Sequence, residues 1–293
     1  MTAALATAED VVTRSGLITT FKALVSSALK RLLPAPWYWR FLAWRVGHFD
    51  AELRLLRYLC DKTKASIDVG ASTGSYTVHL LKHSAKCHAF EPRPDAAAYL
   101  ARRLTARPNS RLCVEAVALS DHTGEVPLRV VTAETGRSTI EAANPLESAG
   151  DIELHRVPTR RLDDYANLLE PVGCIKIDVE GHEAAVLRGA RSILARDHPS
   201  LIVEIEERHK RGAIGVVRRY LGELGYRGFF FRRGRLHPLE SFSVDTHQDV
   251  AKITARVDGE SAYVNNFLFL AADSLANARD LIATRSHDDR FLA

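Results

Sequence analysis

The chain has 293 residues, of which 46% are apolar and 26% are charged, so its composition is that of a folded globular protein and excludes a disordered one. Its formal charge of +4, from 40 basic and 36 acidic residues, is too small to indicate nucleic acid as a partner. Its apolar runs are shorter than the roughly 18 residues of a membrane-spanning helix, and we expect neither such a helix nor a secretory signal. The four cysteines form no C-x-x-C pair, which leaves a zinc knuckle or redox motif unsupported and favours a reducing, cytoplasmic location.

Residues 1–60 are predicted to form a helical extension ahead of the main domain. Apolar residues recur at spacings of three and four up to Leu32, and Pro34 then ends the pattern. The segment Trp37–Arg45 that follows is dense in aromatic side chains and arginine. We expect it to pack as a cap over the sheet or the active site, and the alternative is peripheral contact with a membrane surface through residues 20–45.

Strand-like and helix-like stretches alternate from residue 65 onward. The predicted strands are Ser66–Val69, Cys87–Glu91, Leu112–Leu119, Cys174–Val179 and Leu201–Ile205. The predicted helices are Tyr76–His83, Pro94–Leu104, Glu183–Leu194 and Ile214–Leu224. Alternation in units of roughly 25–30 residues predicts an α/β fold with a doubly wound, mostly parallel sheet. Two late strands, Tyr226–Arg232 and Asn266–Leu270, are expected to form an antiparallel pair at the sheet edge.

The stretch between residues 120 and 160 interrupts this alternation. It holds one short predicted strand, Val126–Val131, and then a run from Thr132 to Gly150 that is rich in small and polar residues and has no period. A loop of this length predicts either a segment close to the substrate or a surface insertion without a role. Arg161–Tyr165 is expected to open a further helix.

The stretch Ser66–Thr77 is typical of a strand, a tight turn and the start of a helix. Gly70 and Gly74 allow the backbone to turn sharply and a ligand to approach it, and the following helix directs its free N–H groups at the turn. The stretch contains neither G-x-G-x-x-G nor the lysine of a triphosphate-binding loop, which weakens a dinucleotide or triphosphate assignment. Asp68 on the strand instead favours a cationic or zwitterionic nucleoside.

Glu91 ends the second predicted strand, seventeen residues after Gly74. In doubly wound folds an acid at this strand end accepts hydrogen bonds from the two ribose hydroxyls, and we prefer this role. The alternative is a surface acid in front of Pro92.

Several further segments occur in a fixed order along the chain. They are Phe90-Glu91-Pro92, Ala118-Leu119-Ser120-Asp121 with Gly124, Ile175–Glu183 and Asn266–Leu270, after the first segment Ser66–Thr77. Together they resemble the FkbM-type methyltransferases over about residues 60–270, and the K-I-D-V-E-G-x-E block is the most specific of them. The resemblance implies a Rossmann-like class I methyltransferase domain over residues 61–275, with a seven-stranded sheet and a C-terminal tail over 276–293. It also implies S-adenosylmethionine as the cofactor.

The resemblance also implies where the cofactor binds. The methionine part would lie against Asp68, Gly70 and Gly74, and the ribose against Glu91. Ser120 and Asp121 would lie near the adenine. Two further residues of the turn, Ser72 and Tyr76, complete the predicted cofactor site.

A second group of charged residues belongs to the K-I-D-V-E-G-x-E block. Lys176 and Asp178 share one face of the predicted strand, because side chains alternate along a strand, and Glu180 lies just past its end. Transfer of a methyl group to a hydroxyl needs an aligned oxygen and a base, for which Asp178 is the first candidate and Glu180 the second. Glu204, at the end of the fifth strand, is a candidate for binding acceptor hydroxyls.

Other side chains near these acids receive weaker assignments. Glu183 is expected to fix the start of the next helix, and His209 is expected to be solvated and not a base. Asp178, Glu180 and Glu204 could together bind a divalent cation, but no spacing requires it, and no metal is predicted.

The sequence therefore predicts an S-adenosylmethionine-dependent O-methyltransferase acting on a hydroxyl of a small molecule or glycan, such as a sugar, glycolipid or secondary metabolite. One alternative is an RNA methyltransferase, because nine Lys or Arg and two acids lie between Glu207 and Arg235. Nucleic acid is not favoured, since the aromatic run Phe229–Phe231 among these residues is better explained as a buried strand than as a stacking surface for bases. A further alternative, based on Trp37–Arg45, is a membrane-associated binding protein that has lost turnover. The oligomeric state is not indicated.

Overall fold

The structure is a computed structural model that describes residues 51–104, 111–132, 136–146, 151–257, 260–272 and 274–275. The chain divides into two compact units, Met1–Arg45 and Val46–Ala293, and all described residues belong to the second. The predictions for the aromatic segment, for membrane contact through residues 20–45 and for the tail 276–293 lie outside the described residues. Within the described ranges, none of the helices is both long enough and apolar enough to cross a membrane.

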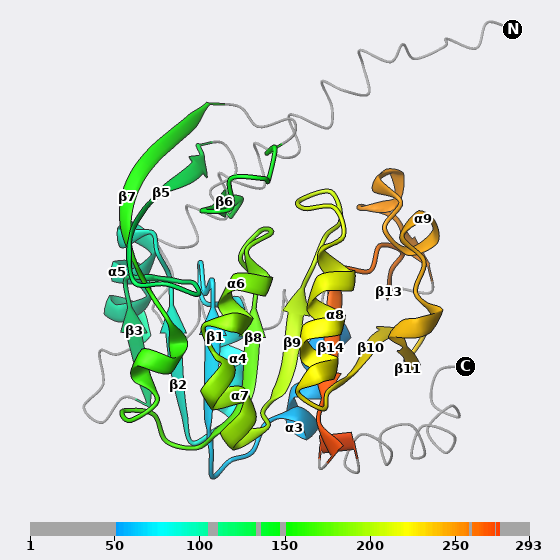
Figure 1. Ribbon diagram of the computed structural model, residues 1–293, viewed down its shortest axis with the longest axis horizontal. Coiled ribbons are helices and arrows are strands. Elements are labelled where there is room, and N and C mark those ends of the chain that lie inside the picture. Colours follow the sequence, from blue (N-terminus) through cyan, green and yellow to red (C-terminus); the bar gives the residue numbers. More distant parts are fainter. Residues whose placement is uncertain are drawn as a thin grey trace, which may run out of the picture. The chain divides into compact units, whose positions relative to one another are not determined.

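The main sheet has eight strands in the order β11-β10-β14-β9-β8-β1-β2-β3 (Figure 1). Its parallel part consists of β1 (Ala65–Val69), β2 (Lys86–Phe90), β3 (Leu112–Glu115), β8 (Val172–Ile177) and β9 (Ser200–Glu204). The remaining strands are β14 (Asn266–Leu270), which is antiparallel to β9, β10 (Arg227–Arg232), which is antiparallel to β14, and β11 (Arg235–Pro238). The predicted doubly wound, mostly parallel class is confirmed, with one strand more than the seven expected.

The additional strand β11 forms a hairpin with β10 and takes the edge that we predicted for β10 and β14. The antiparallel pairing of β10 with β14 is itself as predicted. The sequence Arg-Leu-His-Pro of β11 shows no apolar alternation, which is why residue patterns gave no indication of it.

Helices pack on both faces of this sheet. They are α4 (Ser75–His83), α5 (Pro94–Leu104), α6 (Glu183–Arg188), α7 (Arg191–Asp197) and α8 (Ala213–Glu223). Figure 1 shows α6, α7 and α8 in front of the sheet and α4 behind it. Shorter elements are α3 (Leu56–Leu59), α9 (Val244–His247) and the paired strands β12 (Arg256–Val257) and β13 (Glu260–Ser261), together with 3-10 turns at Ala51–Leu55, Leu162–Tyr165, Leu239–Ser241 and Val250–Lys252.

The single helix predicted over Glu183–Leu194 is instead two helices, α6 and α7, which are separated at Gly189. A Cβ at Gly189 would lie 1.9 Å from the carbonyl oxygen of Ser120, so the two backbones touch there. The carboxylate of Asp163 accepts hydrogen bonds from the N–H groups of Ser192 and Ile193 and thereby starts α7. The helix predicted at Arg161–Tyr165 is only a 3-10 turn.

A second, four-stranded sheet has the order β4-β7-β5-β6. Its strands are β4 (Ala118–Leu119), β5 (Gly124–Val131), β6 (Ser138–Thr139) and β7 (Ile152–Arg160). The single strand predicted over Leu112–Leu119 is therefore wrong, because β3 belongs to the main sheet and β4 to this one. The sequence did not predict β7, since its first five residues are all exposed and only Val157 and Thr159 of it are buried.

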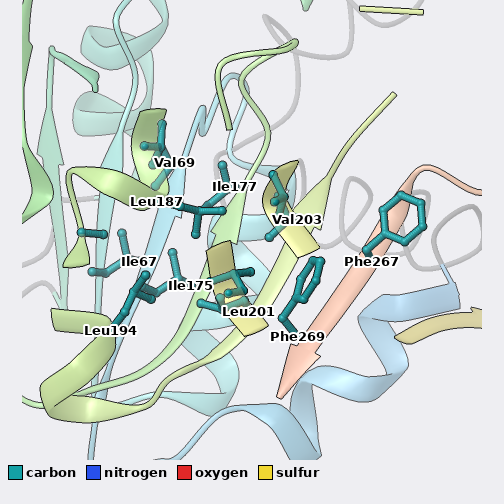
Figure 2. Close-up of a cluster of buried hydrophobic side chains, with 14 of the residues drawn as sticks. Ile67, Val69, Ile175, Ile177, Leu187, Leu194, Leu201, Val203, Phe267 and Phe269 are labelled. Atoms are coloured by element: carbon teal, nitrogen blue, oxygen red, sulfur yellow. The ribbon is translucent and has the colours of Figure 1, made fainter. Parts of the chain in front are cut away.

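The core between the main sheet and α6, α7 and α8 is built from alternate residues of the central strands. Figure 2 shows these apolar side chains, which β1, β8, β9, β14, α6 and α7 contribute: Ile67, Val69, Ile175, Ile177, Leu201, Val203, Phe267, Phe269, Leu187 and Leu194. Burial of each such side chain stabilises the fold by roughly 1.5–3 kcal/mol relative to exposure. Because side chains alternate along a strand, Asp68, Lys176 and Asn266 face the opposite side, toward α4.

Candidate active site

The carboxyl ends of β2, β1 and β8 bring three of the predicted site residues together. Strand register pairs Val69 with Phe90 and with Ile177, so the residues that follow, Gly70, Glu91 and Asp178, lie side by side. Backbone hydrogen bonds fix this edge, from the N–H of Gly70 to the oxygen of Phe90 at 2.9 Å and from the N–H of Asp178 to the oxygen of Val69 at 3.0 Å. Ligands bind at this edge in open α/β sheets.

The turn after β1 requires glycine at Gly70. The residue has φ +78°, and a Cβ on it would lie 1.8 Å from the carbonyl oxygen of Asp178. Gly74 has φ +86° and precedes α4, while Ser72 adopts a positive φ of 46° without being a glycine. The N–H of Ser72 donates to Oε2 of Glu91 at 2.6 Å, which stabilises that conformation. The turn and the end of β2 therefore form one unit.

Glu91 is buried and holds two backbone donors. Its Oε2 accepts from the N–H of Ser72, and its Oε1 accepts from the N–H of Arg93 at 2.9 Å. Burial raises the pKa of Glu91, and these two hydrogen bonds oppose the rise. Each carboxylate oxygen keeps a further lone pair. This acceptor geometry fits the two neighbouring hydroxyls of a ribose.

Asp68 lies on β1 and is almost fully buried. Burial raises its pKa to about 6, and the hydroxyl of Thr77, which donates at 2.5 Å, and the charge of Lys176 oppose the rise. A buried carboxylate with this balance is stabilised by an additional positive charge. S-adenosylmethionine carries a sulfonium and an ammonium group, and Asp68 together with Glu91 fits such a ligand.

Lys176 on β8 has an exposed fraction of 1% and lies among groups from α4, β9 and β14. Its Nζ donates to Oδ1 of Asn266 at 3.0 Å and lies 3.5 Å from Oε2 of Glu204. It also lies 4.8 Å from the ring centre of Tyr76. The ammonium group of Lys176 on β8 therefore contacts side chains from two other elements with predicted site residues, α4 and β9.

Glu204 occupies the end of β9 as predicted. The register pairs it with Asn266, and its Oε1 accepts from the side-chain amide of Asn265 at 2.7 Å. Its side chain keeps an exposed fraction of 21%, so its carboxylate is within reach of a ligand at this edge. Sequence patterns assigned no site role to Asn265 and Asn266, although two polar residues at the start of an apolar strand are a usable signal.

Glu180 forms a turn immediately after β8 with a positive φ of 54°. The Thr139 hydroxyl and the Asn144 amide both donate to its carbonyl oxygen, at 3.0 and 2.7 Å. Part of the segment Thr132–Gly150, predicted either to lie near the substrate or to be a surface insertion, is thus attached to the K-I-D-V-E-G-x-E block. In Figure 1, β6, which ends with Thr139, lies above the ends of β1 and β8.

The Glu180 carboxyl is protonated near neutral pH. Burial, with the nearby charges of Asp178 and Glu204, raises its pKa to about 9. Its Oε2 lies 3.1 Å from Nε2 of His209, and among the described residues neither atom has a hydrogen bond of acceptable geometry. His209 is buried and not solvated as expected, and burial lowers its pKa to about 4. Both groups are therefore uncharged at pH 7.

Ser120 and Asp121 contact α6 and the turn before it. The Ser120 hydroxyl lies 2.9 Å from Nε2 of His182, and Asp121 accepts from Arg188 at 2.8 Å. Burial raises the pKa of Asp121, but hydrogen bonds from His122 and Arg188 outweigh this and lower it to about 2. In the described part of the chain their hydrogen bonds do not reach the turn Gly70–Gly74. Adenine contact by these two residues stays a prediction.

Glu183 and His182 lie at the start of α6 and hold the turn before it through polar contacts. Glu183 accepts from the N–H of Gly181 at 2.7 Å and thus fixes the turn before α6, as expected. His182, which the sequence left without a role, also lies 3.2 Å from Oε2 of Glu141 through its Nδ1. Within the ranges that the structure covers, no group of three or more His, Cys, Asp or Glu is arranged to hold a metal ion.

A doubly wound sheet of this strand order, with a glycine turn and acids at the ends of its first, second and fourth parallel strands, defines a class I methyltransferase fold. Residues 68–227, more than half of the chain, match the family described as the methyltransferase FkbM domain. The chain belongs to this FkbM methyltransferase family, and its methyl donor is S-adenosylmethionine. The family, the fold class and the cofactor are as the sequence predicted.

Comparison with individual proteins gives distant relatives. Hexuronic acid methyltransferase AglP of Haloferax volcanii is 23% identical over 154 residues, which are 52% of this chain and 61% of that protein. The FkbM methyltransferase of Methylobacillus flagellatus aligns with 17% identity and a TM-score of 0.46 over 71% of this chain and 44% of its own. SMU.1697c, a putative methyltransferase from Streptococcus mutans, aligns with 12% identity and a TM-score of 0.41 over 75% of this chain and 95% of its own. The chain thus spans less than two thirds of the curated relative.

Proposed function

We propose that the chain transfers the methyl group of S-adenosylmethionine to a hydroxyl group of a sugar, glycolipid or secondary metabolite. The observation that carries this proposal is the position of Asp178, a carboxylate at the end of β8 in backbone contact with Gly70 of the cofactor turn. The name of AglP, a hexuronic acid methyltransferase, favours a sugar acceptor. A small molecule or glycan is accordingly the expected partner.

Asp178 is the side chain best suited to remove the hydroxyl proton. S-adenosylmethionine supplies an electrophilic methyl group next to a good leaving group, so the protein must align the acceptor oxygen and accept its proton. Burial raises the pKa of Asp178, which makes its carboxylate a stronger base, and the charge of Lys176 opposes the rise and favours the ionised form.

Glu180 and Glu204 support the acceptor in other ways. Because Glu180 is protonated at neutral pH, it acts as a hydrogen-bond donor and not as the base. Glu204 is partly exposed and its Oε1 is oriented by Asn265, so it accepts a hydrogen bond from a second acceptor hydroxyl. An acceptor with several hydroxyls uses both groups at once.

A screen of methyl transfer to sugars, uronic acids, lipid-linked sugars and polyketides tests the proposal. The Asp178→Asn variant is expected to lose at least about 100-fold in rate while still binding S-adenosylhomocysteine. Glu170→Gln is the matched control. Glu170 is half-exposed, pairs with Lys86 and lies just before the start of β8, at the end of the strand opposite to Asp178. Full activity of Asp178→Asn would contradict the assignment of Asp178 as the base. Failure of the wild-type chain to bind S-adenosylmethionine would contradict the proposed function.

Nothing in the described part of the chain favours RNA as the acceptor. Several residues of the basic run are engaged within the chain, because Arg208 pairs with Glu206, Lys210 with Glu141 and Arg218 with Glu240. The binding-protein alternative depends on Trp37–Arg45, which lies outside the described residues. A cytoplasmic location stays a prediction.

A further inference from the structure

Lys176 is a buried cation in a strand that is otherwise apolar. Its ammonium group has the fixed partners described above, Oδ1 of Asn266, Oε2 of Glu204 and the ring of Tyr76. An ammonium group is costly to bury unless its charge is compensated, so its retention in the centre of the sheet needs a reason. The function proposed above uses the neighbouring acids but gives Lys176 no direct contact with a reacting atom.

The acids around Lys176 belong to both the proposed cofactor site and the proposed acceptor site. Strand register places Asp68 of the cofactor half directly beside it on β1, and Asp178 lies two residues further along the same face of β8. Its charge lowers the pKa of Asp68, of Asp178 and of Glu183, in each case against burial, which raises it. The same ammonium group therefore acts on the cofactor carboxylate and on the base.

We propose that Lys176 is a positioning residue that keeps the Asp178 base ionised and holds Glu204 in place for the acceptor. This inference rests on the proposed methyl transfer. The lysine itself touches neither the methyl group nor the acceptor oxygen. It acts through the effect of its positive charge on Asp178 and through its ion pair with Glu204.

The pH dependence has a defined sign. Asp178 must lose its proton to act, and loss of a neighbouring positive charge makes this loss harder, so activity at low pH falls first. Charged or titratable groups from five parts of the fold act on Asp178. They are Asp68 on β1, Lys176 on β8, Glu180 in the turn after β8, Glu183 on α6 and Glu206 after β9. Within this group Lys176 supplies the positive charge, whereas Asp68, Glu183 and Glu206 oppose ionisation of Asp178 and Glu180 is neutral at pH 7.

The experiment compares Lys176→Met, which keeps the length of the side chain and removes its charge, with the wild-type chain. The loss of kcat/KM at pH 6 is expected to be about ten times greater than the loss at pH 9. The loss of stability in urea is expected to depend on pH in the opposite direction. The urea midpoint falls more at pH 9 than at pH 6, because the buried carboxylates are then ionised without their cation.

Two further variants complete the design. Lys86→Met is the matched control, because Lys86 is a half-exposed strand lysine that pairs with Glu170 at 3.0 Å, and its loss should change neither pH profile. Lys176→Gln keeps a hydrogen-bond donor for Asn266 and replaces the methionine variant if that protein does not fold. Equal losses at both pH values, in activity and in urea midpoint, overturn the inference. If the wild-type chain neither binds S-adenosylmethionine in calorimetry nor transfers methyl groups, the proposed function fails instead.

Discussion

The carbonyl oxygen of Asp178 lies where the Cβ of any residue other than glycine at position 70 would have to be placed. The cofactor turn and the strand that carries the proposed base are therefore in direct main-chain contact. Under the proposed function, this contact joins the backbone of the cofactor turn to the backbone that carries the base, so a backbone shift on one side should also move the other.

Gly70→Ala tests this contact. The substitution combines a left-handed backbone, which costs about 1–2 kcal/mol for a residue with a Cβ, with a main-chain overlap at 1.8 Å. We expect the free energy of unfolding in urea to fall by more than about 2 kcal/mol and S-adenosylmethionine binding to be lost in calorimetry. Gly215→Ala in α8 is the control. Its Cβ would meet nothing within 4 Å, so it should raise helix stability by about 0.5–1 kcal/mol.

Asp68 is expected to lower the free energy of unfolding of the chain, although it favours binding of the cofactor. Its pKa is raised from 3.8 to about 6, so the folded state holds the proton more tightly, and stability falls as pH rises through this window. At 1.36 kcal/mol per pKa unit the effect is on the order of 3 kcal/mol above pH 6. Asp68→Asn should therefore unfold at higher urea concentration than the wild type at pH 7, and the difference should vanish near pH 4.

The same variant should bind S-adenosylmethionine at least about tenfold more weakly at pH 7, since it lacks the buried negative charge. In the wild type, binding should weaken as pH falls through about 6. Binding that is independent of pH between 5 and 8 would show that Asp68 does not contact the cofactor.

Glu180→Gln distinguishes the two candidate bases. The pKa of Glu180 is raised to about 9, so the wild-type side chain is a neutral acid at pH 7 and the amide resembles it. The rate at pH 7 is expected to change less than about threefold, compared with the loss of about 100-fold for Asp178→Asn. Above pH 9 the variant should be the more stable protein in urea, because it has no buried carboxylate to ionise. A rate loss equal to that of Asp178→Asn would make Glu180 the base.

The segment around β6 is expected to control acceptor binding. Thr139→Val and Asn144→Ala each remove one hydrogen bond to the Glu180 carbonyl oxygen, worth about 1 kcal/mol. We expect the acceptor KM to rise about fivefold for each, with no change in S-adenosylmethionine affinity. Thr132→Val is the control, since the Thr132 hydroxyl donates to the Asp151 carbonyl oxygen at the end of the β5–β7 pair where Val131 lies opposite Ile152. A rise in the cofactor dissociation constant with an unchanged acceptor KM would place the segment on the cofactor side.

Sequence patterns predicted the parts of the fold that bury apolar residues regularly. The central strands, such as β1 and β8, are short apolar runs bounded by turn residues, and α5 starts at Pro94 as predicted. The strands β7 and β11 could not be predicted, because β7 buries only two of its nine residues and β11 buries none, which leaves no regular apolar pattern. Their positions depend on partners that are distant in the sequence.

The site shows the same division. Asp68, Glu91 and Asp178 could be placed at one sheet edge, because each is the last or the last but one residue of a predicted strand. The attachment of Asn144 to Glu180 and the contact of Glu180 with His209 could not, since they join residues through the tertiary fold. Patterns along the chain carry no information about such contacts.

The hydrogen bonds from Thr139 and Asn144 end on a carbonyl oxygen, not on a side chain. Substitutions at position 180 can therefore change the chemistry of the turn without detaching the segment that covers it. Conversely, Ala142 and Ala143, which are exposed and lie between the two anchors, can be exchanged while the carbonyl contacts persist. Under the proposed function, exchange of these two alanines offers a way to alter acceptor choice while the proposed cofactor residues stay as they are.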